Sequence, residues 1–335
     1  MGYEVWEEVE QVMDDNGIDF MFNLSGGSPR RGQTLAMMLA RDSGGRVANL
    51  MTVDWEGIDE VAFGEVLAAE LELLVTEYGY VGLKISKALG LYASDGRGEL
   101  IDVDDPRLFP LWAKAGELGV PVFIHTGDPR AFWDPITPEN ERYAELSVHP
   151  GWSFHGPEFP SRDELLRQRD HLIERFPETT FVGVHFGNNP EDPAYVGSLL
   201  DRYPNFYVDL AARVPELGGH EPEVIRELFI RHQDRILFAT DIVVVRQRGQ
   251  TSYTLGSGGE EPDRFEEIEP FYDTHDRWLQ THDHDFEHPT PIQGDWTIDA
   301  IGLPDEVLDR IYYLNAYELV LEGRVTEVRL PDDFR

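Results

Sequence analysis

Three residues of types that bind metal ions or move protons stand directly after short apolar runs: His125, His185 and Asp241. Imidazole and carboxylate side chains are ligands for zinc, manganese and iron, and they also exchange protons with substrates. If the three runs are parallel strands lying side by side, their carboxyl ends meet at one rim and the three side chains converge there. The sequence therefore predicts one site built at the ends of three strands. The runs are residues 121–124, 180–184 and 235–240.

The elements that would position these residues recur along the chain. Seven short runs are rich in Val, Ile and Phe, as expected for strands that are covered on both faces. Amphipathic helical patterns lie between most of them. Alternating strands and helices indicate a parallel sheet, and 335 residues suit one (β/α)₈ barrel with insertions. The seven runs are residues 18–24, 47–53, 81–86, 120–124, 181–184, 205–209 and 236–239, and clear helical patterns cover 5–15, 107–118, 161–176, 223–232 and 303–316.

An eight-stranded barrel needs one strand more than these runs supply. The chain opens instead on a helical pattern, with Trp6, Val9, Val12 and Met13 at helical spacing. In a series of alternating strands and helices, this helix should follow a strand. We therefore infer that the first strand of the barrel is missing from this chain.

Two segments interrupt the alternation, and we expect one barrel domain over residues 1–335 with insertions at about 127–160 and 242–299. The first contains Trp133, Trp152 and Phe154, which we expect to pack as a small core of their own or to cover a substrate. The second contains the small-residue stretch 256–259 and an acidic stretch. Both insertions follow strands that end in a candidate site residue, where barrels carry lids and substrate contacts.

The charge of the chain is unusual, because 64 acidic residues stand against 28 basic ones and give a net charge of −36. Lys84, Lys87 and Lys114 are its only lysines. A disordered acidic chain or a strongly basic partner could explain this charge. We favour adaptation to high salt, since the acids are spread among regular apolar runs and salt screens their repulsion. The same charge disfavours nucleic-acid binding.

Composition also limits where the chain works and which metals it could hold. It has neither a long apolar run nor a signal-like start, so we expect a cytoplasmic protein that does not bind membranes. It contains no cysteine, which excludes disulfides and thiolate metal sites. A metal would be held by His and carboxylate side chains. Assembly into a homo-oligomer stays open.

The motifs around the three rim residues resemble those of the metal-dependent amidohydrolase superfamily. The closest resemblance is to the amidohydrolase-related branch, which includes the aminocarboxymuconate-semialdehyde decarboxylase-like proteins. It rests on Val-Phe-Ile-His125-Thr-Gly, Val-Gly-Val-His185-Phe-Gly and Leu-Phe-Ala-Thr-Asp241, which occur in the order the family requires. The resemblance extends from about residue 18 to residue 316 and implies a barrel of the metallo-dependent hydrolase type.

The resemblance implies a role for each rim residue. His125 would bind a divalent metal ion, with zinc favoured and manganese or iron as alternatives. His185 would bind the same ion or polarise the substrate. Asp241 would bind the metal or act as the general base toward metal-bound water. The family also has a His-x-His pair at the end of strand one, which this sequence lacks there. Its only His-x-His is His282-Asp-His284, in a late acidic loop, and no role is transferred to it.

Further residues are candidates for binding substrate. Lys84 stands inside an apolar run of a chain almost free of lysine, so it would bind a substrate anion, pair with a barrel carboxylate or, as in some amidohydrolases, be carboxylated. Arg213 would suit a substrate carboxylate because of its planar fork, and a structural ion pair is the alternative. Asp209 would orient Arg213 or His185. Asp128 and Arg130 would line the mouth, Asn23 and Ser25 would contact substrate, and His282, His284 and His288 would form a second metal cluster or a solvated loop.

These residues favour a metal-dependent hydrolase that acts on a small, anionic substrate. In it, a metal ion would lower the pKa of bound water toward about 7, Asp241 would accept the proton, and His185 would stabilise developing negative charge. A non-oxidative decarboxylase on the same site is the first alternative. A catalytically inactive barrel that serves as a binding or assembly subunit is the second, because two expected ligands would lie on the missing strand.

Overall fold

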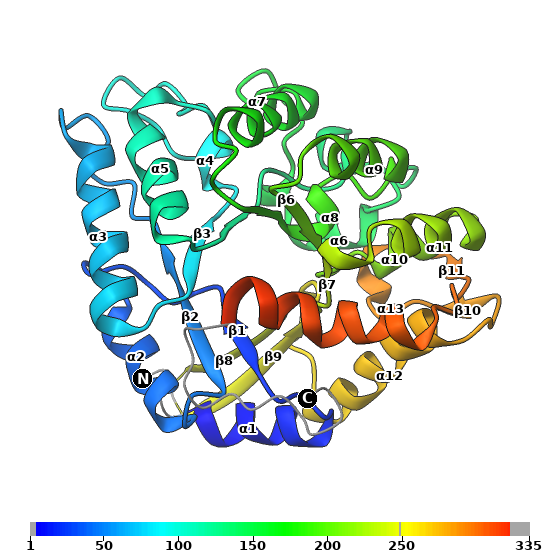
Figure 1. Cartoon of the computed structure of the whole chain (residues 1–335). Coiled ribbons are helices and arrows are strands. Elements are labelled where there is room, and N and C mark those ends of the chain that lie inside the picture. Colours follow the sequence, from blue (N-terminus) through cyan, green and yellow to red (C-terminus); the bar gives the residue numbers. More distant parts are fainter. Residues whose placement is uncertain (1–4, 248, 322–335) are drawn as a thin grey trace.

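The computed structural model describes residues 5–247 and 249–321, and its centre is a curled sheet of seven parallel strands (Figure 1). The strands are paired in sequence order, β1 to β7. Each strand lies within a run that the sequence predicts, so the prediction of a parallel (β/α) barrel-type sheet is confirmed. The strands are β1 Met21–Asn23, β2 Val47–Thr52, β3 Gly82–Ile85, β4 Val122–Ile124, β5 Phe181–Gly183, β6 Phe206–Asp209 and β7 Ile236–Leu237.

Six helices connect successive strands and pack on the outer face of the sheet (Figure 1). Local signals set their ends: the Ser161 hydroxyl accepts a hydrogen bond from the Glu164 N–H at the start of α7, and Asp192 caps α9 in the same way. These helices are α2 Gln33–Asp42, α3 Phe63–Tyr78, α5 Phe109–Leu118, α7 Arg162–Arg175, α9 Pro193–Arg202 and α11 Pro222–Arg231. The other α-helices are α1 Trp6–Asp15, α4 Ala88–Leu91, α6 Tyr143–Val148, α8 Val184–Gly187, α10 Val214–Gly218, α12 Ile268–Gln280 and α13 Asp305–Asp309.

The sheet is open between β1 and β7, which do not pair with each other. The segment that begins with α13 crosses this opening (red in Figure 1) and continues as two π-helical turns, Arg310–Leu314 and Tyr317–Leu321. Its Val320 is buried among interior side chains that include Leu50 and Phe123. This C-terminal helical segment is longer than the predicted one, and it forms a wall of the barrel interior.

Hydrogen bonds join this segment to the free edge of β7. The carbonyl of Ile311 accepts a bond of 2.9 Å from the N–H of Phe238. The Asn315 side-chain amide donates to the carbonyl of Ile236 at 2.8 Å and also to that of Gln233. Backbone groups that an eighth strand would pair are in part satisfied by a helix instead.

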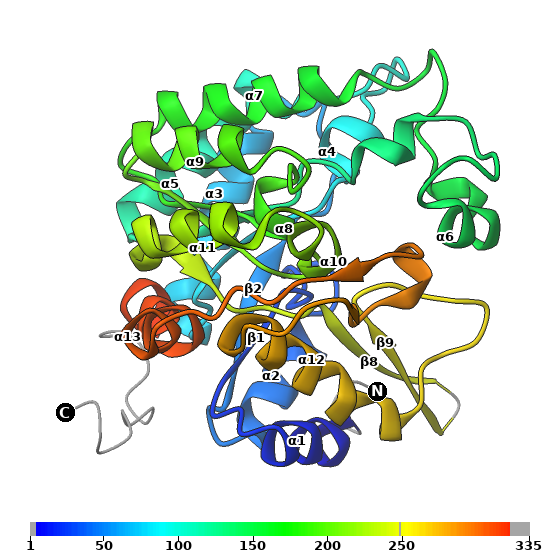
Figure 2. The same cartoon turned by 90° about the vertical axis from the view of Figure 1, so that its right-hand side faces the viewer.

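Both predicted insertion regions lie at the carboxyl end of the strands, on the right in Figure 2. The first carries α6. The second begins with a hairpin directly after Asp241, followed by α12 and two short paired strands. The hairpin packs against α1, where Glu8 accepts hydrogen bonds from Arg246 at 2.6 Å and Thr251 at 2.8 Å. These strands are β8 Ile242–Gln247, β9 Gln250–Leu255, β10 Phe286–Glu287 and β11 Thr297–Ile298.

Within the described residues, the helices are all too short or too polar to cross a membrane.

Candidate functional site

Strand register directs Lys84 and His125 into the barrel interior. Lys84 is paired in register with Phe123, which is paired with Val182, and both of these neighbours belong to the interior cluster. Side chains alternate between the two faces of a strand. His125 follows Phe123 by two residues and therefore faces inward one layer nearer the rim. Lys84 lies one layer deeper.

His185 reaches the site by a different route. Val182 and Val184 face the interior, so a continued strand would aim His185 outward. The backbone instead turns left-handed, with φ and ψ of 57° and 47° at His185 and 55° and 47° at Phe186, and it keeps positive φ through Asn188. Left-handed backbone costs about 1–2 kcal/mol for an ordinary L-residue. This turn redirects His185 toward the rim.

Positive φ angles gather at this end of the sheet. Of the six non-glycine residues with positive φ in the described ranges, five lie within five residues of the carboxyl end of β5, β6 or β7. Strained backbone of this kind persists where the surrounding structure holds it, often at functional sites. These five are His185, Phe186, Asn188, Ala212 and Asp241.

The His125 and His185 imidazoles form an edge-to-face pair with ring centroids 4.4 Å apart. His125 Nε2 lies 3.0 Å from the carbonyl of Gly127 and 3.3 Å from Asp128, both acceptors, so Nε2 carries a proton. His185 Nδ1 donates to the carbonyl of Ala211 at 2.8 Å, which leaves Nε2 available. Burial lowers the pKa of His125 to about 4 and that of His185 well below its usual value. Both rings are therefore neutral at physiological pH.

Two carboxylates and Lys84 form the charged part of the site. Burial raises the pKa of Asp209 to about 7, although the N–H groups of His185 and Ala211 donate to it. Burial also raises the pKa of Asp241, which is surrounded by protein atoms yet open to solvent at the mouth. Lys84 has its pKa lowered by burial to about 8, and the negative charges of Asp209 and Asp241 oppose that change. All three groups are shifted toward exchanging protons near neutral pH.

Arg213 is bound within the protein beside this cluster. It is 5% exposed, donates to the carbonyl of Ala212 at 2.6 Å and lies 3.7 Å from Glu216. Its positive charge lowers the pKa values of both His185 and Asp241. Arg213 therefore acts on the site electrostatically. Asp209, predicted to orient Arg213 or His185, contacts the backbone of His185.

The His and carboxylate side chains of the site offer too few grouped donors for a divalent metal ion. His125 and His185 are adjacent, but residues 5–247 and 249–321 contain no group of three or more His, Asp and Glu side chains arranged to hold an ion. A catalytic zinc site usually has three protein ligands. The side chains present do not make a complete metal site, so the predicted ligand set His125, His185 and Asp241 stays a prediction.

Lys87 is a candidate that sequence reasoning missed. Its ammonium is paired with Asp128, which in turn contacts His125. It also lies 5.6–6.0 Å from the ring centroids of Phe132, Trp152 and Phe154. The available signal was its position just after β3 in a chain with three lysines. Burial opposes the ionisation of Asp128, but Lys87 overcomes this and holds the pKa of Asp128 well below its usual range.

Other predicted residues have structural surroundings. His288 is 4% exposed and accepts a bond from the Thr290 N–H, whereas His284 is exposed and pairs with Asp299. These two and His282 form no metal cluster in the described part of the chain. Asn23 bonds to Asn49. Trp133 and Phe154 pack with ring centroids 4.7 Å apart. The prediction of a separate small core is wrong, because Phe154 belongs to the main hydrophobic core and Trp133 and Trp152 pack against it.

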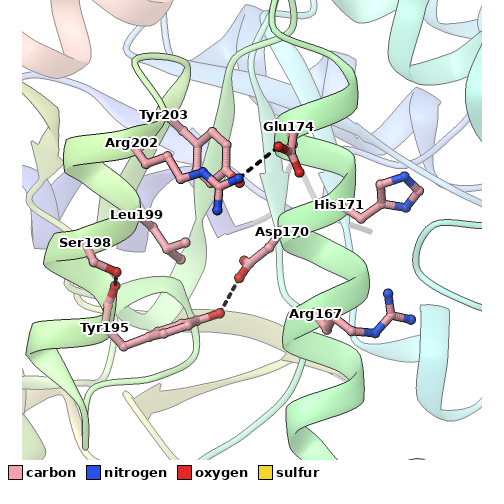
Figure 3. Close-up of a pocket in the computed structure, with 9 residues that line it drawn as sticks. All are labelled: Arg167, Asp170, His171, Glu174, Tyr195, Ser198, Leu199, Arg202 and Tyr203. Atoms are coloured by element: carbon pink, nitrogen blue, oxygen red, sulfur yellow. Dashed lines mark hydrogen bonds and ion pairs between the residues drawn. The ribbon is translucent and has the colours of Figure 1, made fainter.

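A separate polar hollow lies between α7 and α9, outside the sheet (Figure 3). Its charged groups are largely paired with one another or with neighbours: Arg202 bonds to Glu174 at 2.9 Å, and Asp170 accepts from Tyr195. None of the predicted site residues lines it. The residues that line it are Arg167, Asp170, His171, Glu174, Tyr195, Ser198, Leu199, Arg202 and Tyr203.

A curled parallel sheet with imidazole, carboxylate and ammonium groups at its strand ends is the architecture of a (β/α) barrel enzyme. The chain belongs to the amidohydrolase family, whose model matches residues 34–320. This confirms the resemblance predicted from the motifs. No curated protein matches the chain.

Solved structures with the same fold include the three described below, each with a TM-score above 0.5. An uncharacterised TIM-barrel protein from Bordetella bronchiseptica has a TM-score of 0.54 at 18% identity, covering 93% of this chain and 81% of its own. A dihydroxybenzoic acid decarboxylase from Polaromonas sp. JS666 was solved with manganese and the inhibitor 2-nitroresorcinol. It has a TM-score of 0.54 at 16% identity, and the match covers 93% of this chain and 84% of the decarboxylase. A 4-oxalomesaconate hydratase from Rhodopseudomonas palustris has a TM-score of 0.52 at 16% identity, and the match covers 94% of this chain and 80% of the hydratase.

Proposed function

We propose that this amidohydrolase-family protein is a non-oxidative decarboxylase of a small aromatic or unsaturated carboxylate. The observation that carries the proposal is the position of Asp241, whose carboxyl group is open to solvent at the mouth beside the positive charges of Lys84 and Arg213. Burial raises its pKa, although both positive charges oppose that change. A carboxyl whose pKa is raised holds its proton to a higher pH than an ordinary carboxyl and can deliver that proton to a carbon atom. The dihydroxybenzoic acid decarboxylase with this fold supports the choice of reaction.

Lys84 would hold the substrate anion at the start of the reaction. It lies inside the barrel, and no described carboxylate forms an ion pair with it at contact distance. Its ammonium remains protonated below a pKa of about 8. Arg213 would add positive potential without direct contact, since its guanidinium is engaged by Ala212 and Glu216.

Asp241 would supply the proton that replaces the lost carboxylate. Protonated Asp241 donates its proton to the carbon that bears the substrate carboxylate, and Asp241 becomes ionised. The bond between that carbon and the carboxylate breaks, its electron pair stays with the substrate carbon framework, and CO₂ leaves. Water returns a proton to Asp241 for the next cycle. The unprotonated nitrogens of the neutral rings, Nδ1 of His125 and Nε2 of His185, would accept hydrogen bonds from substrate hydroxyl groups.

Hydrolysis is the second candidate function. One observation favours it: His185 is fixed through Nδ1 to the Ala211 carbonyl, which leaves Nε2 for a ligand as in metal-bound histidines. In that reaction ionised Asp241 would act as the base toward water. The described side chains do not complete a metal site for this reaction.

The pH dependence of turnover distinguishes the two reactions. The purified chain in high salt would be supplied with 2,6-dihydroxybenzoate and manganese, and CO₂ release would be followed across pH. Decarboxylation needs protonated Asp241, so kcat should fall as pH rises through the raised pKa of this group. Hydrolysis needs ionised Asp241, so kcat should rise over the same range. Asp241→Asn should abolish either activity.

A panel of substrates tests the remaining alternative, a barrel that binds a ligand without transforming it. A panel of aromatic and unsaturated carboxylates, tested beside esters and amides of similar size, covers both reaction classes. Hydrolysis of esters or amides without CO₂ release would refute the decarboxylase. An absence of turnover with every member, in the presence of manganese or zinc, would favour a barrel that binds rather than transforms its ligand.

A further inference from the structure

The loop after β4 and the left-handed turn after β5 are joined by one side chain, that of Asn188. Its carbonyl oxygen accepts a hydrogen bond of 2.8 Å from the N–H of Thr126, and its NH₂ group donates to the carbonyl of Gly127 at 2.6 Å. Asn188 is 2% exposed. The amide thus pairs with the loop backbone as a neighbouring strand would.

Two arginines from α7 hold the other side of this junction. Arg162 donates to the carbonyls of Asp128 at 3.1 Å and Asn188 at 2.7 Å. Arg169 donates to the carbonyl of Gly187. Backbone N–H groups of the turn bond to the carbonyls of residues 184–186, and the two guanidinium groups supply donors to the carbonyls of Gly187 and Asn188.

The carbonyl of Gly127 is where this junction meets the site. It accepts from the Asn188 amide and also, at 3.0 Å, from His125 Nε2. His185 lies three residues before Asn188 in the same turn. One side chain therefore fixes both the backbone that bears His185 and the oxygen atom that orients His125.

We propose that Asn188 is a positioning residue, which holds the His125 and His185 imidazoles in their edge-to-face pair by clamping residues 126–127 to the left-handed turn. Asn also tolerates positive φ better than most residues, so a purely local backbone role is the competing explanation. The two explanations differ in what glycine should do, because glycine adopts positive φ freely but has no amide. Only the activity measurement in the test below depends on the proposed function, since the NMR measurements use the ligand-free chain.

The test compares Asn188→Gly with Asp285→Gly. Asp285 is the one described non-glycine residue with positive φ away from the site, and its side chain accepts one hydrogen bond of 2.7 Å from Thr297. Imidazole N–H signals of His125 and His185 are followed by nitrogen-15 NMR on the ligand-free chain, in which His125→Gln and His185→Gln variants assign them. The exchange rate of the His125 Nε2 proton with water is the main quantity.

In Asn188→Gly we expect this exchange to become about tenfold faster, as for the loss of one hydrogen bond, and the contact between the two rings to weaken. With a decarboxylated substrate, kcat should fall by about 100-fold through misplacement of the reacting groups, and KM should change far less. Asp285→Gly should alter none of these. Unchanged imidazole signals in Asn188→Gly would overturn the clamp.

A second variant keeps the proposal testable if Asn188→Gly does not fold. Asn188→Asp keeps the acceptor for Thr126 but turns a carboxylate oxygen toward the Gly127 carbonyl, so the same His125 signal should move. If both variants unfold, Asn188 supports the fold as a whole and the proposal is wrong. If the signals move while no carboxylate is turned over, the clamp stands and the decarboxylase fails.

Discussion

Replacing Lys84 with methionine should stabilise the fold while removing activity. Lys84 lies in the barrel interior in register with Phe123, and its burial lowers its pKa from 10.5 to about 8. The folded chain therefore holds a cation that would be better solvated in the unfolded chain. Methionine has a similar length and no charge, so it should fill the same space without that cost.

The expected gain follows from the pKa. A tenfold change in proton affinity is worth about 1.4 kcal/mol, so the change from 10.5 to about 8 corresponds to about 3 kcal/mol. This value already includes the attraction of Asp209 and Asp241, and the partial solvent access of Lys84 reduces what substitution recovers. We therefore expect Lys84→Met to raise the free energy of unfolding by about 1–3 kcal/mol near neutral pH.

The gain should depend on pH in a defined direction. Between about pH 8 and pH 10.5 the folded wild type has released a proton that the unfolded chain still holds, so its stability rises with pH across this window. The advantage of Lys84→Met should be complete below about pH 8 and vanish toward pH 10.5. Urea unfolding of both proteins at a series of pH values, in high salt, measures it.

Lys114→Met is the matched control, because Lys114 is a lysine on an outer helix that pairs with Glu117 at 2.8 Å. Loss of a surface pair should change stability by at most about 1 kcal/mol in the unfavourable direction. The reasoning would be refuted if Lys84→Met were less stable than wild type at neutral pH, or if its gain did not decline toward pH 10.5. Turnover by Lys84→Met should fall by at least about 100-fold.

Two further predictions concern the fold. The free energy of unfolding should increase between about 0.1 M and 1 M KCl, because salt shortens the Debye length from about 10 Å to 3 Å around a chain of charge −36; equal urea midpoints at both concentrations would contradict adaptation to high salt. Asn315→Leu should cost about 2–3 kcal/mol, since it leaves the carbonyls of Gln233 and Ile236 without their donor. Asn16→Leu, which loses a bond within α1, is the control, and an equal loss in both variants would deny Asn315 a special role at the β7 edge.

The strands and the inward-facing residues were predictable because both depend on local patterns. Runs of Val, Ile and Phe mark all seven strands of the sheet, and alternation alone directs Lys84 and His125 inward. The crossover helix α7 was recognised for the same reason, since its apolar side chains recur at helical spacing.

The orientation of His185 could not be predicted in this way. Its side chain turns into the site because His185 and Phe186 adopt left-handed backbone, which neither residue type favours. The burial of Phe186 and donors from α7 outweigh that local preference, and both come from residues distant in sequence. Only Gly187 and Asn188, which tolerate positive φ, gave a local hint.

The hairpin β8–β9 was missed although its sequence carries a signal. Residues 242–247 and 250–255 are rich in β-branched side chains and flank Gly249. The C-terminal segment was recognised as a helix, but its place in the barrel interior was not. The spacing of its apolar residues, which include Val320, is equally compatible with a helix in the outer layer of a barrel and with one in the interior. Only the open edge of the sheet makes the interior available to it.

The position of that C-terminal segment has a consequence for how the protein is synthesised. Side chains of β2, β4 and β5 complete their packing only when residues as late as Val320 are in place. While the ribosome is still producing the second half of the chain, the earlier strands emerge with an apolar surface that has no cover. Such surfaces are prone to aggregation. Nascent chains stopped just before residue 305 should therefore bind chaperones more strongly than chains extended past residue 321.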